Sequence, residues 1–137
     1  MNKLLYLSAF AAASLTSCRH DSDSPMPALS DELAGSWRLT NVQCYCPPGQ
    51  PVPNEVLKLD TGQHFQLFRN GTLVAEGTYA TGQGINCSAS NTVPVITLTT
   101  ASSTVYVPKG AYTVENNVLT IDQCSAADGP KYTYQRQ

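Results

Sequence analysis

The sequence is poor in charged side chains, and it lacks the basic surface that nucleic-acid binding requires. Only 13% of its 137 residues are charged, against about 25% in typical soluble domains. Its 8 lysines and arginines are outnumbered by 10 acidic residues, which gives a formal net charge of −2. Such a chain has no cationic surface with which to neutralise a row of phosphates. We therefore expect no nucleic-acid partner.

The sequence also has few of the groups that enzymes use for acid–base or nucleophilic chemistry. Of its two histidines, His20 lies near the N-terminus and His64 lies within a predicted strand, where a structural histidine is the usual case. No Gly-x-Ser-x-Gly motif, glycine-rich phosphate loop or His-Glu-x-x-His motif occurs. We therefore expect that the protein is not an enzyme, and we assign it no catalytic residue and no cofactor.

Uncharged apolar residues form a long run only at the N-terminus. Lys3 precedes a stretch that ends in Leu15-Thr16-Ser17-Cys18. This stretch is too short to span a membrane, and its composition is typical of a secretory signal peptide. Its last four residues resemble the lipobox of bacterial lipoproteins at every position. An ordinary secretory signal with a cysteine near the cleavage point is the alternative.

The lipobox resemblance implies cleavage before Cys18, followed by attachment of a diacylglyceryl group and acylation (palmitate) of that residue. Several acyl chains anchor a protein stably, whereas one chain binds only marginally. The resemblance thus predicts a lipid-anchored protein of the bacterial cell envelope, in the outer membrane, with the leaflet left open. It divides the chain into a signal peptide (1–17), a lipidated cysteine with a flexible tether (18–32) and a folded domain (33–137).

The sequence of the folded domain predicts β-strands separated by turns. Thr, Val and Tyr are frequent after Ser36, and Asn70-Gly71 is the strongest hairpin signal because both positions tolerate a positive φ. Residues 80–92 are predicted to be a polar loop. Eight short antiparallel strands with tight turns favour an all-β, up-and-down barrel, and a β-sandwich is the alternative. The expected strands are 36–45, 55–60, 63–69, 72–79, 93–100, 103–115, 118–123 and 131–137.

The start of the first strand carries a family resemblance. Gly35-Ser36-Trp37 resembles the Gly-x-Trp motif of the lipocalin and lipocalin-like families, in which a basic residue from the last strand covers the tryptophan. The resemblance implies that Arg136 covers Trp37 and closes the barrel. The strand count also places these two residues at the same end, and such a cation–π contact contributes about 0.5–2 kcal/mol. The domain is shorter than a typical lipocalin, which argues against a deep ligand cavity.

Four cysteines remain once Cys18 is assigned to the lipid anchor. An even number in an exported domain predicts disulfides, here among Cys44, Cys46, Cys87 and Cys124. Cys44 and Cys46 would share one face of an extended strand, where a direct bond between them would be strained. We therefore expect each of them to pair with Cys87 or Cys124.

A metal site is the alternative interpretation of the same cysteines. Cys44 and Cys46, together with Cys87, Cys124 or His64, would suit zinc or copper. The Cys-x-Cys spacing does not match zinc ribbons, and an exported domain favours disulfides, so we expect no bound metal.

Two functions fit these features. The first is a binding module whose barrel mouth holds a small hydrophobic ligand, lined by Tyr79, Tyr112, Tyr132 and Tyr134, because tyrosine offers both apolar area and a hydroxyl group. The second is a structural or protein-interaction module, with a barrel filled by its own side chains and an envelope protein as its partner.

Overall fold

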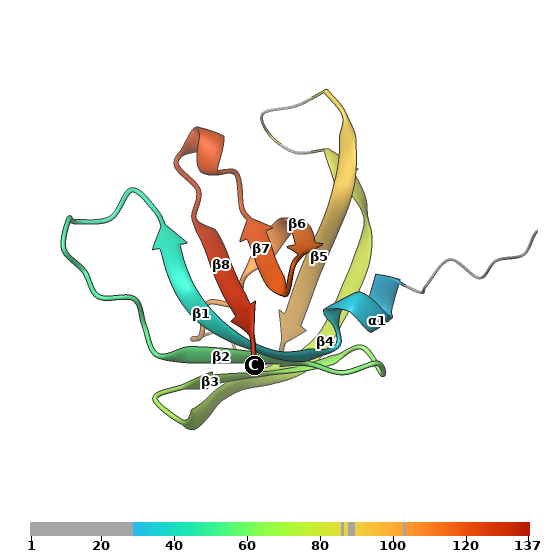
Figure 1. Ribbon diagram of the computed structural model, residues 1–137, viewed down its shortest axis with the longest axis horizontal. Helices are drawn as coiled ribbons and strands as arrows, with labels where there is room; N and C mark the ends of the chain where they lie inside the picture. Colours follow the sequence, from blue (N-terminus) through green and yellow to red (C-terminus); the bar gives the residue numbers. More distant parts are fainter. Residues whose placement is uncertain (1–28, 86, 88–89, 103) are drawn as a thin grey trace, which may run out of the picture.

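The computed structural model describes residues 29–85, 87, 90–102 and 104–137, and it is a closed antiparallel barrel (Figure 1). Its eight strands pair in sequence order, and β8 pairs with β1 to close the ring. The predicted up-and-down barrel is confirmed, and the β-sandwich alternative is wrong. The elements are α1 (Leu29–Leu33), β1 (Gly35–Gln43), β2 (Glu55–Leu59), β3 (His64–Arg69), β4 (Thr72–Ile85), β5 (Thr92–Thr100), β6 (Lys109–Glu115), β7 (Val118–Asp122), η1 (Ser125–Ala127) and β8 (Lys131–Arg136).

The predicted signal peptide, Cys18 and most of the predicted tether lie outside the described residues. The described part of the chain starts with α1, whose first residue lies before the predicted domain boundary at residue 33, and Leu33 is fully buried. In the described part of the chain, no helix has the length and apolar character needed to cross a bilayer.

Alternating side chains fill the inside of the barrel. Leu57 and Leu59 of β2, and Phe65 and Leu67 of β3, are buried, while Lys58 and Gln66 between them are exposed. The period of two places each apolar set on the inner face. The buried core consists of Leu33, Trp37, Leu39, Leu57, Leu59, Phe65, Leu67, Ala75, Tyr79, Ile96, Leu98, Tyr112, Leu119, Ile121 and Tyr134.

One end of the barrel is closed by Trp37, Arg136 and α1. The guanidinium of Arg136 lies 4.1 Å from the centroid of the Trp37 ring, so the structure brings the predicted pair together. Arg136 also donates to the carbonyl oxygens of Glu32 and Ala34, and the Trp37 indole N–H donates to that of Leu33 at 2.8 Å. Arg136 and Trp37 therefore satisfy carbonyl groups at the C-terminal end of α1, which would otherwise lack partners.

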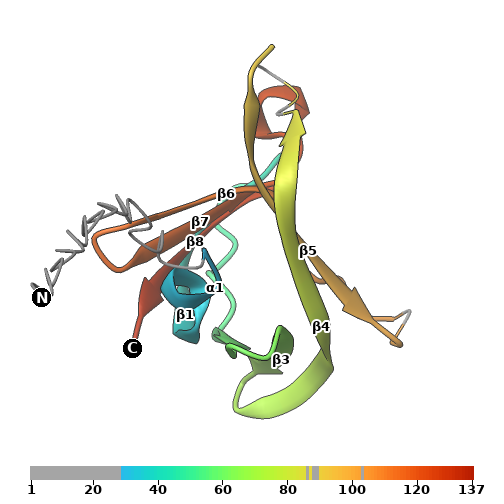
Figure 2. The ribbon, with the colours of Figure 1, turned by 90° about the vertical axis from the view of Figure 1, so that its right-hand side faces the viewer.

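The β4–β5 hairpin is longer than expected. β4 continues through the predicted loop as far as Ile85, and its pairs with β5 run from Gly77↔Thr100 to Ile85↔Thr92. β5 pairs with β6 only through Val95–Thr97, so the far part of the hairpin extends as a two-stranded ribbon (Figure 2). The β4 residues of this ribbon are largely exposed on both faces, whereas Val93, Pro94 and Val95 of β5 are half-buried. The β4 residues therefore lack the apolar alternation from which a strand is predicted.

β6 is shorter than expected. It begins at Lys109, whereas the predicted strand began at Ser103. Pro108 precedes it and has no backbone N–H to give to a ladder. Val105 and Val107 pack against the core from the connection before β6. Their alternation therefore reflects contact with the core and not strand pairing.

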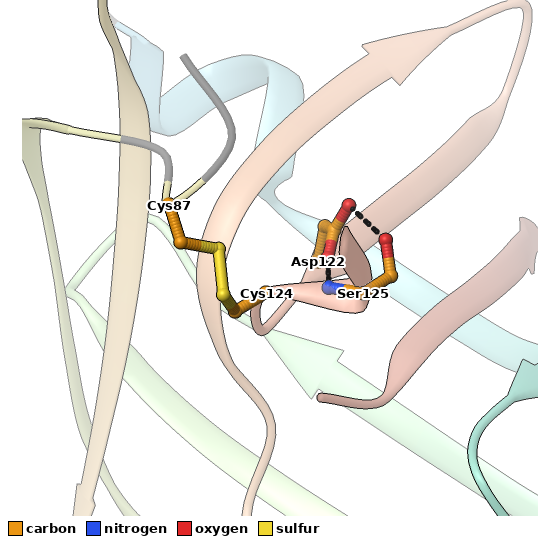
Figure 3. Close-up of a disulfide and its surroundings, with 4 residues drawn as sticks. All are labelled: Cys87, Asp122, Cys124 and Ser125. Atoms are coloured by element: carbon orange, nitrogen blue, oxygen red, sulfur yellow. Dashed lines mark hydrogen bonds between the residues drawn. A yellow bond between two sulfur atoms is a disulfide. The ribbon is translucent and has the colours of Figure 1, made fainter. Parts of the chain in front are cut away.

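A disulfide fastens the far end of the β4–β5 hairpin to the connection after β7. Cys87 is bonded to Cys124, with their Cα atoms 5.6 Å apart (Figure 3). Asp122 accepts hydrogen bonds from the backbone N–H and the hydroxyl group of Ser125, at 2.7 and 2.8 Å. These bonds hold the turn that begins at Cys124, whose φ of 67° is left-handed. The extension of the hairpin thus brings Cys87 to Cys124.

We predict that Arg136→Ala lowers the free energy of unfolding by about 2–3 kcal/mol, because it removes a cation–π contact and two charged hydrogen bonds. Urea denaturation followed by circular dichroism measures this loss. Arg38→Ala on the exposed face of β1 is the matched control and should change stability by about 0.5 kcal/mol or less. A loss at Arg136 no larger than that at Arg38 would contradict the closing role.

Candidate ligand-binding site

A cleft of about 490 Å³ opens at the end of the barrel opposite Trp37. Its floor and wall come from Leu39 and Val42 of β1 and from Tyr132 of β8, and its cover comes from the connection between β1 and β2. This connection, residues 44–54, extends outward from the end of β1 (Figure 1). Three of its prolines line the cleft: Pro47, Pro51 and Pro53. Because proline fixes φ, they stiffen the cover.

Two charged residues lie at the base of the cleft because strand alternation turns them inward. Glu55 is the first residue of β2 and shares its inner face with Leu57. Arg69 is the last residue of β3, in register with Glu55 and on the face of Leu67. Both therefore face the interior at the rim, where the apolar core ends.

Glu55 is buried and fully paired. Its residue exposure is 3%, and its Oε2 accepts a hydrogen bond from Arg69 Nε at 2.8 Å. Its Oε1 accepts one from the Tyr134 hydroxyl at 2.9 Å. The Arg69 side chain is 39% exposed, and its Nη2 donates to the Tyr106 carbonyl oxygen at 3.3 Å. A buried carboxylate needs such partners, because an unpaired one costs several kcal/mol, to order of magnitude.

The tyrosines at this end stay protonated. Burial, reinforced by the nearby Glu55 carboxylate, raises the pKa of Tyr134 well above its usual 10. Burial, followed by the neighbouring Tyr106, likewise raises the pKa of Tyr132. The Tyr106 and Tyr132 rings lie 6.2 Å apart, which is a favourable aromatic separation. The raised pKa values keep Tyr132 and Tyr134 protonated in alkaline solution as well as at neutral pH.

The structure does not gather the four predicted tyrosines around one cavity. Tyr79, Tyr112 and Tyr134 are buried in the core, and only Tyr132 lines the cleft. Tyr79 donates its hydroxyl hydrogen to the Asp60 carbonyl oxygen at 2.7 Å. The prediction placed all four at the barrel mouth, but the rings of Tyr79, Tyr112 and Tyr134 fill the interior instead.

The expected cysteine pairing is wrong. Cys44 is bonded to Cys46, with their Cα atoms 5.1 Å apart. β1 ends at Gln43, so the two cysteines lie on a bend and not on the extended strand that the prediction assumed. Residues two apart on a strand would be about 6.6 Å apart. All four cysteines that we assigned to disulfides are therefore bonded, and both bonds involve a loop.

Cys44, Cys46, Cys87 and Cys124 are all in disulfides, so they cannot serve as the thiolate ligands of the metal site that we considered. Within the described residues, no three metal-binding side chains form a group. His64 is exposed, and its Nδ1 lies 3.4 Å from Asp60 Oδ1. Asp60 accepts a hydrogen bond from the backbone N–H of His64, which lowers the pKa of Asp60. His64 and Asp60 thus form a surface contact at the turn between β2 and β3.

Two further hollows lie on the surface of the barrel. One of about 770 Å³ is lined largely by exposed outward-facing polar residues such as Lys58, Gln66 and Glu76. Another of about 300 Å³ lies beside the Cys87–Cys124 disulfide. Neither is lined by a buried charged side chain, whereas the cleft at the mouth is lined by Glu55.

Comparison with known proteins gave no relative. No family model, no curated protein and no solved structure matches the chain. The eight-stranded barrel is consistent with a lipocalin-like fold.

We predict that Glu55 and Arg69 are energetically coupled. Arg69→Met should cost about 2–3 kcal/mol of stability because it leaves a buried carboxylate without its cation. Glu55→Leu should cost less, because Arg69 can reach solvent. The double variant Glu55→Leu/Arg69→Met should be more stable than Arg69→Met alone. Urea denaturation of the four proteins completes the cycle, and additive losses would contradict the coupling.

Proposed function

We propose that the protein is a lipid-anchored module of the bacterial cell envelope that binds a small, largely apolar molecule in the cleft at the barrel mouth. The cleft carries this proposal. Its lining mixes apolar side chains with polar groups, and its volume of about 490 Å³ lies within the range of roughly 300–1,000 Å³ that small-molecule sites occupy.

The filled interior limits the ligand to a shallow site. Leu39 and Tyr134 are buried directly beneath the cleft, so a long acyl chain has no lumen to enter. A compact molecule fits better, with its apolar body against Val42 and the prolines. A polar group on it would meet the Tyr132 hydroxyl or the exposed part of Arg69.

The alternative is a protein-interaction module, and one observation favours it. Large apolar side chains are exposed on the connections at the mouth, namely Tyr45, Val52 and Tyr106. Exposed apolar groups that lie together mark interaction surfaces as well as ligand sites. The two functions differ in whether a small molecule occupies the cleft.

The anchor is tested through Cys18. We predict that the wild-type chain fractionates with membranes and that Cys18→Ala moves it to the soluble fraction, because the acyl chains would be lost. Mass spectrometry of the mature N-terminus should show a lipidated Cys18. An unmodified N-terminus on membrane-extracted protein would contradict lipid anchoring.

The ligand site is tested with native mass spectrometry and a probe. Protein extracted gently from its own membrane should carry a small molecule, and 1-anilinonaphthalene-8-sulfonate should compete with it. Val52→Asp places a charge in the cleft cover and should weaken probe binding at least about tenfold, the equivalent of 1.4 kcal/mol. Ile85→Asp is the control, since Ile85 is 76% exposed on the β4–β5 hairpin. No bound molecule, with equal probe binding by both variants, would overturn the binding proposal and leave the interaction module.

A further inference from the structure

The two disulfides of this barrel differ in what they hold together. Cys87–Cys124 joins residues 37 apart and fastens the long hairpin to the connection after β7. Cys44–Cys46 joins residues two apart, with only Tyr45 between them. Cys46 is exposed and Cys44 is half-buried, at the start of the connection that covers the cleft.

The fold stabilises these two bonds unequally. A disulfide restricts the unfolded chain more when it closes a longer loop. Folding and disulfide formation belong to one thermodynamic cycle. The free energy by which a disulfide stabilises the fold therefore equals the free energy by which the fold protects that disulfide from reduction. Cys44–Cys46 closes a very short loop, so the fold protects it little. Exposed or strained disulfides are the labile and catalytic ones, whereas structural disulfides resist reduction.

The surroundings of Cys44–Cys46 give a second polypeptide access to it. Tyr45 is 91% exposed and presents an aromatic ring directly between the two cysteines. Both cysteines line the cleft, next to Pro47 and Val52. An extended peptide could place a thiol at the exposed Cys46 while its apolar side chains contact these residues.

We propose that Cys44–Cys46 is a reactive disulfide that oxidises dithiols in substrate polypeptides. This activity uses residues of the same cleft cover, but it does not require that the cleft bind a small ligand. It requires none of the sequence motifs whose absence led us to expect that the protein is not an enzyme.

The thiol–disulfide exchange is balanced in atoms and electrons with a substrate dithiol as its only co-reactant. A substrate thiolate attacks the Sγ of Cys46, the S–S bond to Cys44 breaks, and Cys44 leaves as a thiolate that takes up the proton released by the substrate. The second substrate thiol, as thiolate, then attacks the substrate sulfur of the mixed disulfide, and Cys46 leaves as a thiolate and is protonated. The substrate gains a disulfide and loses two electrons and two protons, and Cys44 and Cys46 become a dithiol.

Redox titration of the full mature chain tests the difference between the two bonds. The protein is equilibrated with mixtures of reduced and oxidised dithiothreitol, free thiols are alkylated, and peptide mass spectrometry locates the labels. Cys44 and Cys46 should become labelled at a ratio of reduced to oxidised dithiothreitol about 50-fold lower than Cys87 and Cys124 require, the factor that the two loop lengths give. Simultaneous reduction of the two disulfides, or earlier reduction of Cys87–Cys124, would overturn the proposal.

Transfer of oxidation is tested with a synthetic peptide that contains two cysteines. The wild-type protein should oxidise about one equivalent of this peptide, and Cys44→Ser/Cys46→Ser should oxidise none. A Cys44→Ser variant keeps Cys46 as a thiol and should form a stable mixed disulfide with oxidised glutathione. Circular dichroism shows whether each variant is folded. A folded double-serine variant that oxidises the peptide as fast as wild type would overturn the proposal.

Discussion

The contact between Arg136 and Trp37 determines which end of the barrel is open. Arg136 comes from the last strand and Trp37 from the first, so their contact lies on the seam where the sheet closes. Arg136 also binds carbonyl groups of α1, and Leu33 of that helix is buried with Trp37. This arrangement fills one end with side chains and leaves the described cleft at the other.

The inward-facing cations at the two ends of the barrel have different kinds of partner. At the closed end, the Arg136 cation meets an aromatic face and carbonyl dipoles. At the mouth, the Arg69 cation meets the buried carboxylate of Glu55, which also accepts a bond from Tyr134. Arg136, Arg69 and Glu55 therefore each have a partner of complementary charge or polarity. Between them, the apolar core gives the barrel a solid interior.

Much of the fold was predictable because it follows from local chemistry. Asn70-Gly71 forms the expected turn, with φ values of 52° and 78°, and alternation fixed which face of β2 and β3 is buried. The same alternation could have found Glu55 and Arg69, since each lies two residues from a core leucine. The extension of β4 to Ile85 carries no such signal, because a strand that is largely exposed on both faces needs no apolar pattern.

The cysteine pairing and the tyrosine pocket could not be predicted in the same way. Whether Cys44 and Cys46 can bond depends on where β1 ends, and one residue decides whether Cys44 lies on a strand or on a bend. Tyr112 and Tyr134 face inward as expected, but whether inward rings fill a barrel or line a cavity depends on its diameter. That diameter is set by all eight strands together.

The central claim is that the ligand site is confined to the mouth and that the interior is filled. Amide chemical-shift mapping with 1-anilinonaphthalene-8-sulfonate tests this most directly, because Trp37 is the single tryptophan and its indole N–H gives one resolved signal from the closed end. The account predicts shifts in Val42, Val52, Arg69 and Tyr132 and none in the Trp37 indole. Shifts of the Trp37 indole and of core amides such as Leu57, with an unchanged mouth, would contradict it.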